Sequence, residues 1–512
     1  MNLASVLTVH PDDAVALVLV PGGSGEPPER TTYGELRAQV AALRGGLAGL
    51  GVRPGDRIAL VAGNHRSFVQ AYLAVLGLGA VAVPLNPASP AAELAREVGA
   101  VRPTVAIIGP GAAATADAFP RSTTIVSVDP VPGQSGQVAS TAAGVVAFAD
   151  LLAATPAPEI DREDGDLAVL LFTSGTAGSP KAAMLTHGNL RSNLEQLQAA
   201  PGRVVRPDDV GLGILPMFHI FGLNVSLGLT LYAGASLVLV PGRFDPATTL
   251  ALVAEHRVTL VASAPPLFAA WAALDVAASA LNTVRLASSG AAPLSEEVAG
   301  AFRDRFGIDL RQGYGLTEAA PVVTTSRLDR PASTATVGVP LPGVLVRLVE
   351  SSGEDALVGD EGEIWVKGPN VFAGYWEDRD ATAAVLTPDG WLRTGDVAVV
   401  GDDGELRLVD RAKDLIIVSG FNVFPAEVEE VLLALEGVAE AAVVGVRDPK
   451  TGEAVKAFVV RDANPAGAAV SEGDVKGWAA SELARYKCPT EVAFVDELPH
   501  GMGGKLLRRQ LR

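Results

Sequence analysis

The stretch "LLFTSGTAGSPKAAMLTHGN", Leu170 to Asn189, joins an apolar run to a loop dense in glycine and hydroxyl residues. The apolar part predicts a buried β-strand. Backbone N–H groups and hydroxyls of such a loop can form a concave anion site, to which Lys181 adds a movable positive charge. The donors and small residues concerned are Thr173, Ser174, Gly175, Thr176, Gly178 and Ser179. The loop is not a Walker A motif, and an ordinary Gly/Ser turn explains it equally well, so other segments must decide.

Apolar runs rich in β-branched residues recur along the chain, with helical patterns between them. They begin near residues 57, 80, 104, 167, 210, 236, 259 and 284. This alternation predicts an α/β fold with layers of largely parallel, buried strands. Several runs end in Gly, Ser or Pro, and ligands of such sheets bind beyond the carboxyl ends of the strands.

The texture of the sequence predicts two domains. Residues 1–410 form a large N-terminal domain of layered α/β sheets, within which residues from about 334 to 410 read as a β-rich subdomain of hairpins. Residues 411–512 have the helices and strands of a small α+β domain. The segment from Gly111 to Thr155, rich in small residues, predicts long surface connections.

Composition limits the classes of function. A formal charge of −18 and 5% aromatic residues disfavour nucleic acid as a partner and give anionic membranes no general attraction. The one cysteine, Cys488, favours a reducing compartment, so we expect a cytoplasmic protein. Leu223 to Gly242 approaches membrane-spanning length, but polar residues interrupt it, which favours a buried helix followed by a buried strand.

Seven motifs, in this order, carry a resemblance that spans nearly the whole chain. They are "TSGTAGSPKAAMLTHGN", "PMFHIFGL" (216–223), "SSGAAPLS" (288–295), "QGYGLTEA" (312–319), "GWLRTGD" (390–396), "DRAKDLIIVSGFNVFPAEVE" (410–429) and "GGKLLRRQLR" (503–512). The chain resembles the adenylate-forming acyl-CoA synthetase superfamily, which includes fatty acid:CoA ligases and 4-coumarate:CoA ligases. Any one motif alone would be weak evidence.

The resemblance implies a reaction in two steps with ATP, Mg²⁺ and CoA. A carboxylic acid is attached to AMP with loss of pyrophosphate, and a thiol then displaces AMP. Thr176 and Glu318 match the positions that face the metal, and a hard cation suits their oxygens. Thr317 matches the position at the α-phosphate, and Lys505 matches a lysine that reaches substrate carboxylate and α-phosphate together. The expected catalytic residues are Lys505, Thr317, Glu318 and His219.

The same resemblance implies a nucleotide site. Small residues let adenine approach the backbone, an aromatic ring covers its other face, a carboxylate accepts both ribose hydroxyls, and a guanidinium binds ribose and phosphate. Beyond the phosphate loop with Thr173 and Lys181, the matching residues are Gly290, Ala291, Ala292, Gln312, Gly313, Tyr314, Thr317, Asp396 and Arg411.

The resemblance also implies that the small domain moves. It rotates about a hinge at Lys413, which withdraws Lys505 and brings Ser419, Gly420 and Phe421 to the cleft as a tunnel for the pantetheine chain of CoA. Gly420 is small enough for that chain to pass.

The expected acyl pocket is mostly apolar or small, which favours an apolar acid, with a medium or long aliphatic chain ahead of an aryl acid. Its wall combines Phe218, His219, Phe221, Leu223, Ser288, Gly290, Gly313, Gly315 and Leu316. His219 stands where amino-acid-activating relatives carry an aspartate, which disfavours an amino acid substrate.

Three classes of function stay open at this point. The leading one is a CoA ligase. The second is a stand-alone adenylating enzyme that loads a carrier protein. The third is a luciferase-like oxygenase, against which stands the lack of any specific luciferin signal, or a non-catalytic nucleotide-binding relative, against which stand the intact Glu318, Asp396 and Lys505. A homodimer also stays open.

Overall fold

The computed structural model describes residues 1–21, 27–129, 145–173, 181–202, 205–242, 244–350, 352–411, 416–463, 465–499 and 508–511. The predictions for Ser174, Gly175, Thr176, Gly178, Lys413 and Lys505 fall outside these ranges. Within them, no helix combines the length and the apolar character that a membrane crossing requires.

Two large sheets form the centre of the large domain. The first has the strand order β16 (Val339–Pro340), β15 (Val322–Thr325), β14 (Leu310–Gly315), β13 (Leu286–Ser289), β12 (Leu260–Ser263), β10 (Val210–Gly213), β11 (Ser236–Leu239), β1 (Val15–Leu19) and β2 (Glu29–Thr32). The second has the order β7 (Val146–Ala147), β6 (Thr124–Ser127), β5 (Val105–Ile108), β3 (Arg57–Val61), β4 (Val81–Leu85), β8 (Leu167–Thr173) and β9 (Lys181–Thr186).

Most strands in these two sheets run parallel, as the buried β-branched runs predict. The main exceptions are β8 with β9 and β14 with β15, which pair antiparallel. The chain between Thr173 and Lys181 therefore connects two neighbouring antiparallel strands. Strand β9 comes between it and the helix α5.

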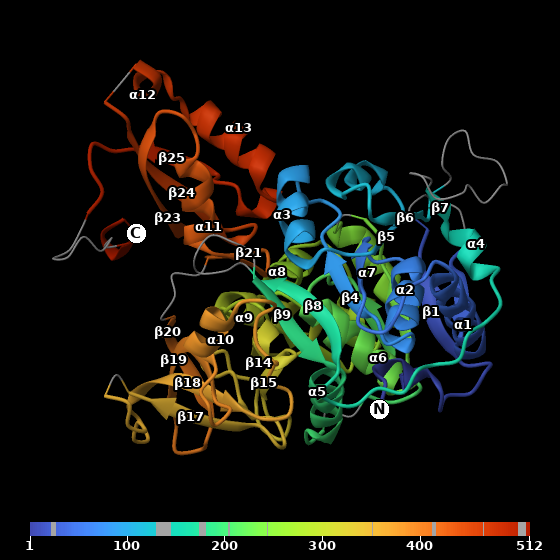
Figure 1. Ribbon diagram of the computed structural model, residues 1–512. Helices are drawn as coiled ribbons and strands as arrows, with labels where there is room; N and C mark the ends of the chain where they lie inside the picture. Colours follow the sequence, from blue (N-terminus) through green and yellow to red (C-terminus); the bar gives the residue numbers. More distant parts are fainter. Residues whose placement is uncertain are drawn as a thin grey trace.

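Helices cover the faces of both sheets (Figure 1). They are α1 (Tyr33–Gly49), α2 (Arg66–Gly77), α3 (Ala91–Val101), α4 (Phe148–Leu152), α5 (His187–Ala199), α6 (Leu229–Tyr232), α7 (Pro246–Glu255), α8 (Pro265–Ala272) and α9 (Glu296–Phe306), with a π-helix, η3, over Phe221–Gly228. Short 3₁₀ turns are η1 (Leu3–Leu7), η2 (Ala113–Ala118), η4 (Ala278–Leu281) and η5 (Thr317–Ala319). Side-chain caps start α1 at Thr32 and α5 at Thr186, where each threonine oxygen accepts from the N3 backbone.

The β-rich part of the chain forms its own antiparallel sheet of β17 (Leu345–Val349), β18 (Glu361–Lys367), β19 (Leu392–Val400) and β20 (Leu406–Arg411), with the short helix α10 (Arg379–Val385) between β18 and β19. Asp396 on β19 is the backbone partner of Arg411 on β20. This sheet lies below the small domain in Figure 1.

The small domain has a sheet with the order β22 (Phe421–Val423), β21 (Ile416–Val418), β24 (Gly452–Arg461) and β23 (Val438–Asp448), and β25 (Glu491–Phe494) pairs with β24. Its helices are α11 (Pro425–Leu433), α12 (Pro465–Ala469) and α13 (Glu472–Glu482), followed by the turn η6 (Arg485–Lys487). The terminal turn η7 (Arg508–Gln510) packs beside β23. A separate apolar core around Val443, Val459 and Leu432 holds these elements together.

The α/β layers, the smaller second domain and the β-rich segment are confirmed. Leu223 to Gly242 contains the π-helix, α6 and the buried strand β11, as expected. The expectation of irregular connections from Gly111 to Thr155 was wrong for η2, β6, β7 and α4. The two strands complete the edge of a parallel sheet, where pairing with neighbours outweighs the low apolar content of the segment.

Candidate active site

Loops that follow strands of both large sheets meet at one cleft beside the small domain. The cavity in this cleft has a volume of about 120 Å³. Thr173 ends β8, and Leu316, Thr317 and Glu318 follow β14. Phe218 and His219 line the same cavity from the segment after β10, and Phe421, Phe424, Tyr486 and Lys487 line it from the small domain. The motifs that are far apart in the sequence are thus brought together.

Glu318 is held by a neighbour that the motifs do not contain. The Tyr375 hydroxyl donates to Glu318 Oε1 at 2.6 Å, and the Lys181 ammonium lies 5.4 Å from the centre of the same tyrosine ring. Burial, with the Glu318 charge as a further cause, raises the pKa of Tyr375. The tyrosine therefore stays protonated at neutral pH and keeps the carboxylate oriented near the predicted phosphate loop.

Tyr314 and Asp396 also meet in space. The buried Tyr314 hydroxyl donates to Asp396 Oδ2 at 2.6 Å, which joins the end of β14 to β19 of the β-rich sheet. Gln312, in contrast, donates to the carbonyls of Ser333 and Thr336, so its amide holds a loop in place.

The small residues around this cleft are needed for close backbone packing. A Cβ at Gly315 would lie 2.2 Å from the Pro321 carbonyl oxygen, and one at Gly290 would lie 3.1 Å from the Phe221 ring. A Cβ at Gly313 would meet the Thr324 carbonyl oxygen at 2.9 Å. Ala291 has φ +63°, an unusual conformation for a residue other than glycine, and it turns the backbone sharply after β13.

His219 is a neutral side chain in a mostly apolar place. Burial lowers its pKa to about 4, and its Nδ1 accepts from the Phe221 N–H at 3.3 Å. The Phe421 ring lies edge-on to the imidazole at 6.2 Å and stacks beside Phe218 at 6.4 Å. A neutral imidazole offers no charge for an ammonium group, in line with the expectation from sequence.

The β21–β22 hairpin of the small domain reaches into the cleft. Its turn is formed by Ser419 and Gly420, both with positive φ. A Cβ on Gly420 would lie 2.8 Å from the Ala264 side chain and 3.8 Å from that of Ala291. Only glycine both adopts this conformation and fits against the large domain in this orientation.

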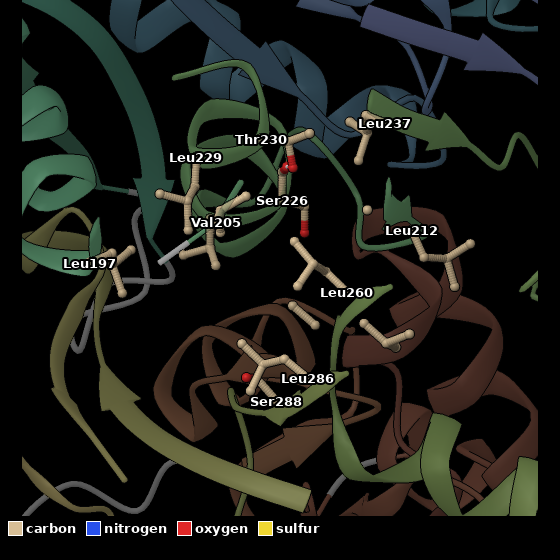
Figure 2. Close-up of a pocket in the computed structure, with 14 residues that line it drawn as sticks. Leu197, Val205, Leu212, Ser226, Leu229, Thr230, Leu237, Leu260, Leu286 and Ser288 are labelled. Atoms are coloured by element: carbon tan, nitrogen blue, oxygen red, sulfur yellow. The ribbon is translucent and has the colours of Figure 1, made fainter. Parts of the chain in front are cut away.

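A second cavity, which we call the deep cavity because most of its lining residues are buried, lies within the large domain. Its lining comes from the π-helix and α6 on one side and from strands β10, β12 and β13 on the other, and Figure 2 shows Leu229 and Thr230 across the space from Leu260 and Leu286. The volume of this cavity is about 80 Å³. Ser226, Thr230 and Ser288 are its polar residues, and none of the lining residues is charged.

Phe221 and Gly290 are close in the sequence to residues that line the cavities. On the π-helix, Phe221 separates His219, which lines the first cavity, from Val225, which lines the second. Gly290 follows Ser288, which lines the second cavity, and the Phe221 ring packs against it. Leu223, expected in the pocket wall, is instead fully buried in the main hydrophobic core and lines neither cavity.

Comparison with known proteins identifies this architecture. Residues 3–376 match the family model described as AMP-binding enzyme, and residues 427–505 match the model of its C-terminal domain. The chain belongs to the AMP-binding enzyme family. Its members named below are acid–CoA ligases and a related synthetase, and the chain is an AMP-forming acid–CoA ligase for an acyl or aryl acid. ATP and CoA are the co-substrates of such ligases.

Individual relatives cover nearly the whole chain. A feruloyl-CoA synthase from Amycolatopsis sp is 39% identical over 484 residues, 94% of this chain and 93% of the relative. A long-chain-fatty-acid–CoA ligase from Yersinia pestis is 35% identical and covers 91% and 86%. The structure of the amide bond synthetase McbA from Marinactinospora thermotolerans has a TM-score of 0.86 at 31% identity, with 100% and 99% covered.

Sequence reasoning missed residues that belong to this site only through the fold. Tyr375 follows strand β18 of the β-rich sheet and is 57 positions from Glu318 in the sequence. The wall of the deep cavity around Val225 and Leu260 was missed as well. An aromatic pair after glycine, "GYW" at 374–376, is the one local signal that could have drawn attention to Tyr375.

Replacing Tyr375 by phenylalanine removes one charge-assisted hydrogen bond to Glu318 and leaves the ring in place. We expect Tyr375→Phe to lower kcat/KM for ATP by roughly tenfold, since such a bond contributes on the order of 1.5–3 kcal/mol. Steady-state kinetics with ATP as the varied substrate measure this. Tyr232→Phe, at the end of α6 and lining neither cavity, is the control and should behave as wild type. An unchanged kcat/KM in Tyr375→Phe would show that the bond does not matter to the site.

Proposed function

We propose that this ligase activates an apolar carboxylic acid with a medium or long aliphatic chain. A carboxylate oxygen of the acid attacks the α-phosphate of ATP, pyrophosphate leaves, and the thiol of CoA then attacks the acyl carbon and releases AMP. The observation that carries the choice of acid is the deep cavity, whose lining is apolar and uncharged. A tail that passes Phe221 would bury its methylene groups there.

An aryl acid is the second candidate, and the similarity to feruloyl-CoA synthases favours it. Such an acid would stay in the first cavity, among Phe218, Phe421 and Leu316, and would not need the deep one. The two candidates therefore differ in whether the deep cavity contributes to binding.

We propose that the loop from Thr173 to Lys181 binds the phosphates of the nucleotide and that Thr317 binds its α-phosphate. Asp396 and Arg411 would take the ribose, and Gly290 to Ala292 with Tyr314 would enclose the adenine. One oxygen of the Asp396 carboxylate accepts from the Tyr314 hydroxyl, so the carboxylate is already oriented to accept from the ribose.

Magnesium fits the residues that line this cleft. Mg²⁺ keeps several waters and binds phosphate oxygens with one or two carboxylates, and Glu318 supplies such a carboxylate on the cavity wall. No group of three or more His, Cys, Asp or Glu side chains suited to a metal occurs in the described ranges. When bound, the ion would neutralise charge on the phosphates. Through its hydrogen bond, Tyr375 would hold the Glu318 carboxylate in place for the ion.

The proposal includes two orientations of the small domain, with the boundary between residues 410 and 411 and the hinge at Lys413. The described orientation has Gly420 against Ala264 and Phe421 beside His219, which suits thioester formation. In the other orientation Lys505 would enter the cleft to balance the charges of the carboxylate and the α-phosphate.

A panel of acids tests the choice of substrate. We expect the highest kcat/KM for straight-chain acids between octanoate and palmitate, with lower values for acetate, benzoate, cinnamate and ferulate. Release of AMP and pyrophosphate, measured with and without CoA, reports turnover. A preference for cinnamate or ferulate would support the aryl alternative, and pyrophosphate release that stays stoichiometric with CoA present would indicate a carrier protein as acceptor.

Val225→Phe narrows the deep cavity without touching the first one. We expect this variant to lose roughly tenfold or more in kcat/KM for the longest acids and little for butyrate, because the tail can no longer be buried. Val225→Ala is the matched variant that enlarges the same space and should keep the long acids. An equal effect of Val225→Phe on all chain lengths would argue against the deep cavity as the acyl site.

Lys505→Ala tests the two-step mechanism. We expect it to abolish formation of acyl-AMP, measured as pyrophosphate exchange, because no other cation is proposed to join carboxylate and α-phosphate. Formation of the thioester from chemically prepared acyl-AMP and CoA should stay close to wild type. Equal loss in both assays would contradict the alternation of the small domain.

A further inference from the structure

A buried cluster of charged residues joins the two domains beside the cleft. Glu93 and Glu97 come from α3 of the large domain, Glu427 from α11 and Lys487 from η6 of the small domain. Each of the four is less than 9% exposed. Figure 1 shows α3 next to α13, where the two domains touch. Glu93, Glu97 and Lys487 also line the first cavity, but none of the four residues is assigned a part in the chemistry proposed above.

Lys487 connects the two domains through its ammonium. Its Nζ donates to Glu427 Oε1 at 2.7 Å within the small domain, and it also donates to Glu93 Oε1 of the large domain. The second oxygen of Glu93 accepts from the Ala484 N–H at 2.6 Å. Both oxygens of the Glu93 carboxylate are thus used by the small domain, and they can be used in this way only in the described orientation.

Burial limits the negative charge in the cluster. Burial raises the pKa of Glu97 to about 8, with the neighbouring Glu93 as a further cause, so Glu97 is protonated at neutral pH. Burial lowers the pKa of Lys487 by itself, but Tyr486, Glu427 and Glu93 outweigh it and the pKa is raised, which keeps the ammonium charged. Burial raises the pKa of Glu427 as well, so the single ammonium faces carboxyl groups whose neutral form is favoured at Glu97 and less disfavoured at Glu427.

Such a cluster favours one orientation more than it adds stability. Removing charges from water costs several kcal/mol for each ion, and the cost is recovered only when every partner is in place. When the small domain rotates away, water can reach Glu93 and Glu97 again, which lowers the free-energy cost of separating the two domains. A shifted orientation that buries the same groups without their partners is strongly disfavoured.

The cluster is linked directly to the cleft. Tyr486 precedes Lys487 in the turn η6, and its ring stacks on Phe421 with centres 4.6 Å apart and an angle of 27° between the planes. Phe421 in turn lies against Phe218 and His219. The position of the lysine therefore determines where Phe421 and the adjacent Gly420 lie in the cleft.

We propose that Lys487 is a positioning residue for thioester formation: its pairing with Glu93 and Glu427 holds the β21–β22 hairpin at the acyl site in the orientation that the second half-reaction needs. The proposal rests on the two-step function proposed above. It assigns no contact between Lys487 and the reacting atoms.

The two half-reactions, measured separately, test this role. Glu93→Gln is the main variant because it leaves every residue of the small domain unchanged and keeps the shape of the side chain. We expect it to lower the rate of thioester formation from acyl-AMP and CoA by about tenfold or more, and to leave ATP–pyrophosphate exchange within about twofold of wild type. Lys487→Met should show the same split between the half-reactions.

Arg96→Ala is the matched control. Arg96 lies on the same helix α3 and also pairs with the small domain, at Glu482 with 3.2 Å between Nη1 and Oε2, but this pair is partly exposed. Exposed pairs contribute little, so we expect both half-reactions of Arg96→Ala to stay within about twofold of wild type. The double variant Glu93→Gln/Lys487→Met should lose no more than the stronger single variant, since both remove one interaction.

The proposal is overturned if Glu93→Gln forms the thioester at the wild-type rate, or if it loses both half-reactions equally. Lys487→Met can also fail by destabilising the small domain, so the melting temperature is measured beside the rates and Glu93→Gln decides. Failure of the proposed function would look different, because wild-type protein would then form no acyl-AMP with any acid or no thioester with CoA.

Discussion

One buried ammonium bridges the two domains in this structure. Lys487 lies between a carboxylate of each domain, and the aromatic residues that follow from it, Tyr486 and then Phe421, reach the wall of the cleft. Because buried charges tolerate few alternative arrangements, the contact specifies one orientation sharply. The cleft contains both Glu318 of the large domain and Phe421 of the small domain only as long as this orientation lasts.

The large domain supplies the fixed part of the site. Parallel strands of two sheets end at the cleft, where Thr173 at the end of β8 and the segments after β13 and β14 contain residues that we propose for the nucleotide. Contacts across distant segments make this platform rigid, among them the bonds from Tyr375 to Glu318 and from Tyr314 to Asp396. The uncharged deep cavity offers room for an apolar tail. A rigid platform and a mobile domain suit a reaction in which one cleft serves two steps.

The sequence predicts the elements of the fold well and their spatial neighbours less well. Buried β-branched runs at β3, β4, β5 and β8 are recognisable because parallel strands are apolar on both faces. Their division into two sheets depends on pairing between distant segments, which no local pattern contains. The motifs bring Thr317, Glu318 and Asp396 into the site, yet Tyr375 contributes only through a contact that the fold creates.

Glu93 and Glu97 illustrate the same limit. Two glutamates four residues apart on a helix look like a solvated face, and like charges at that spacing are mildly destabilising. The function of Glu93 as a buried partner appears only when Lys487, 394 positions further along, lies against it. The deep cavity is a similar case, since Val225 and Leu260 look like ordinary core residues in the sequence.

Distances between the domains in solution test the central claim most directly. Nitroxide labels at Ala95→Cys on α3 and Ala480→Cys on α13, both exposed, can be placed in a Cys488→Ser background and measured by pulsed electron paramagnetic resonance. The account predicts a short distance with AMP and CoA bound, and a second, longer distance with a non-hydrolysable ATP analogue and a fatty acid. One unchanged distance under both conditions would contradict it.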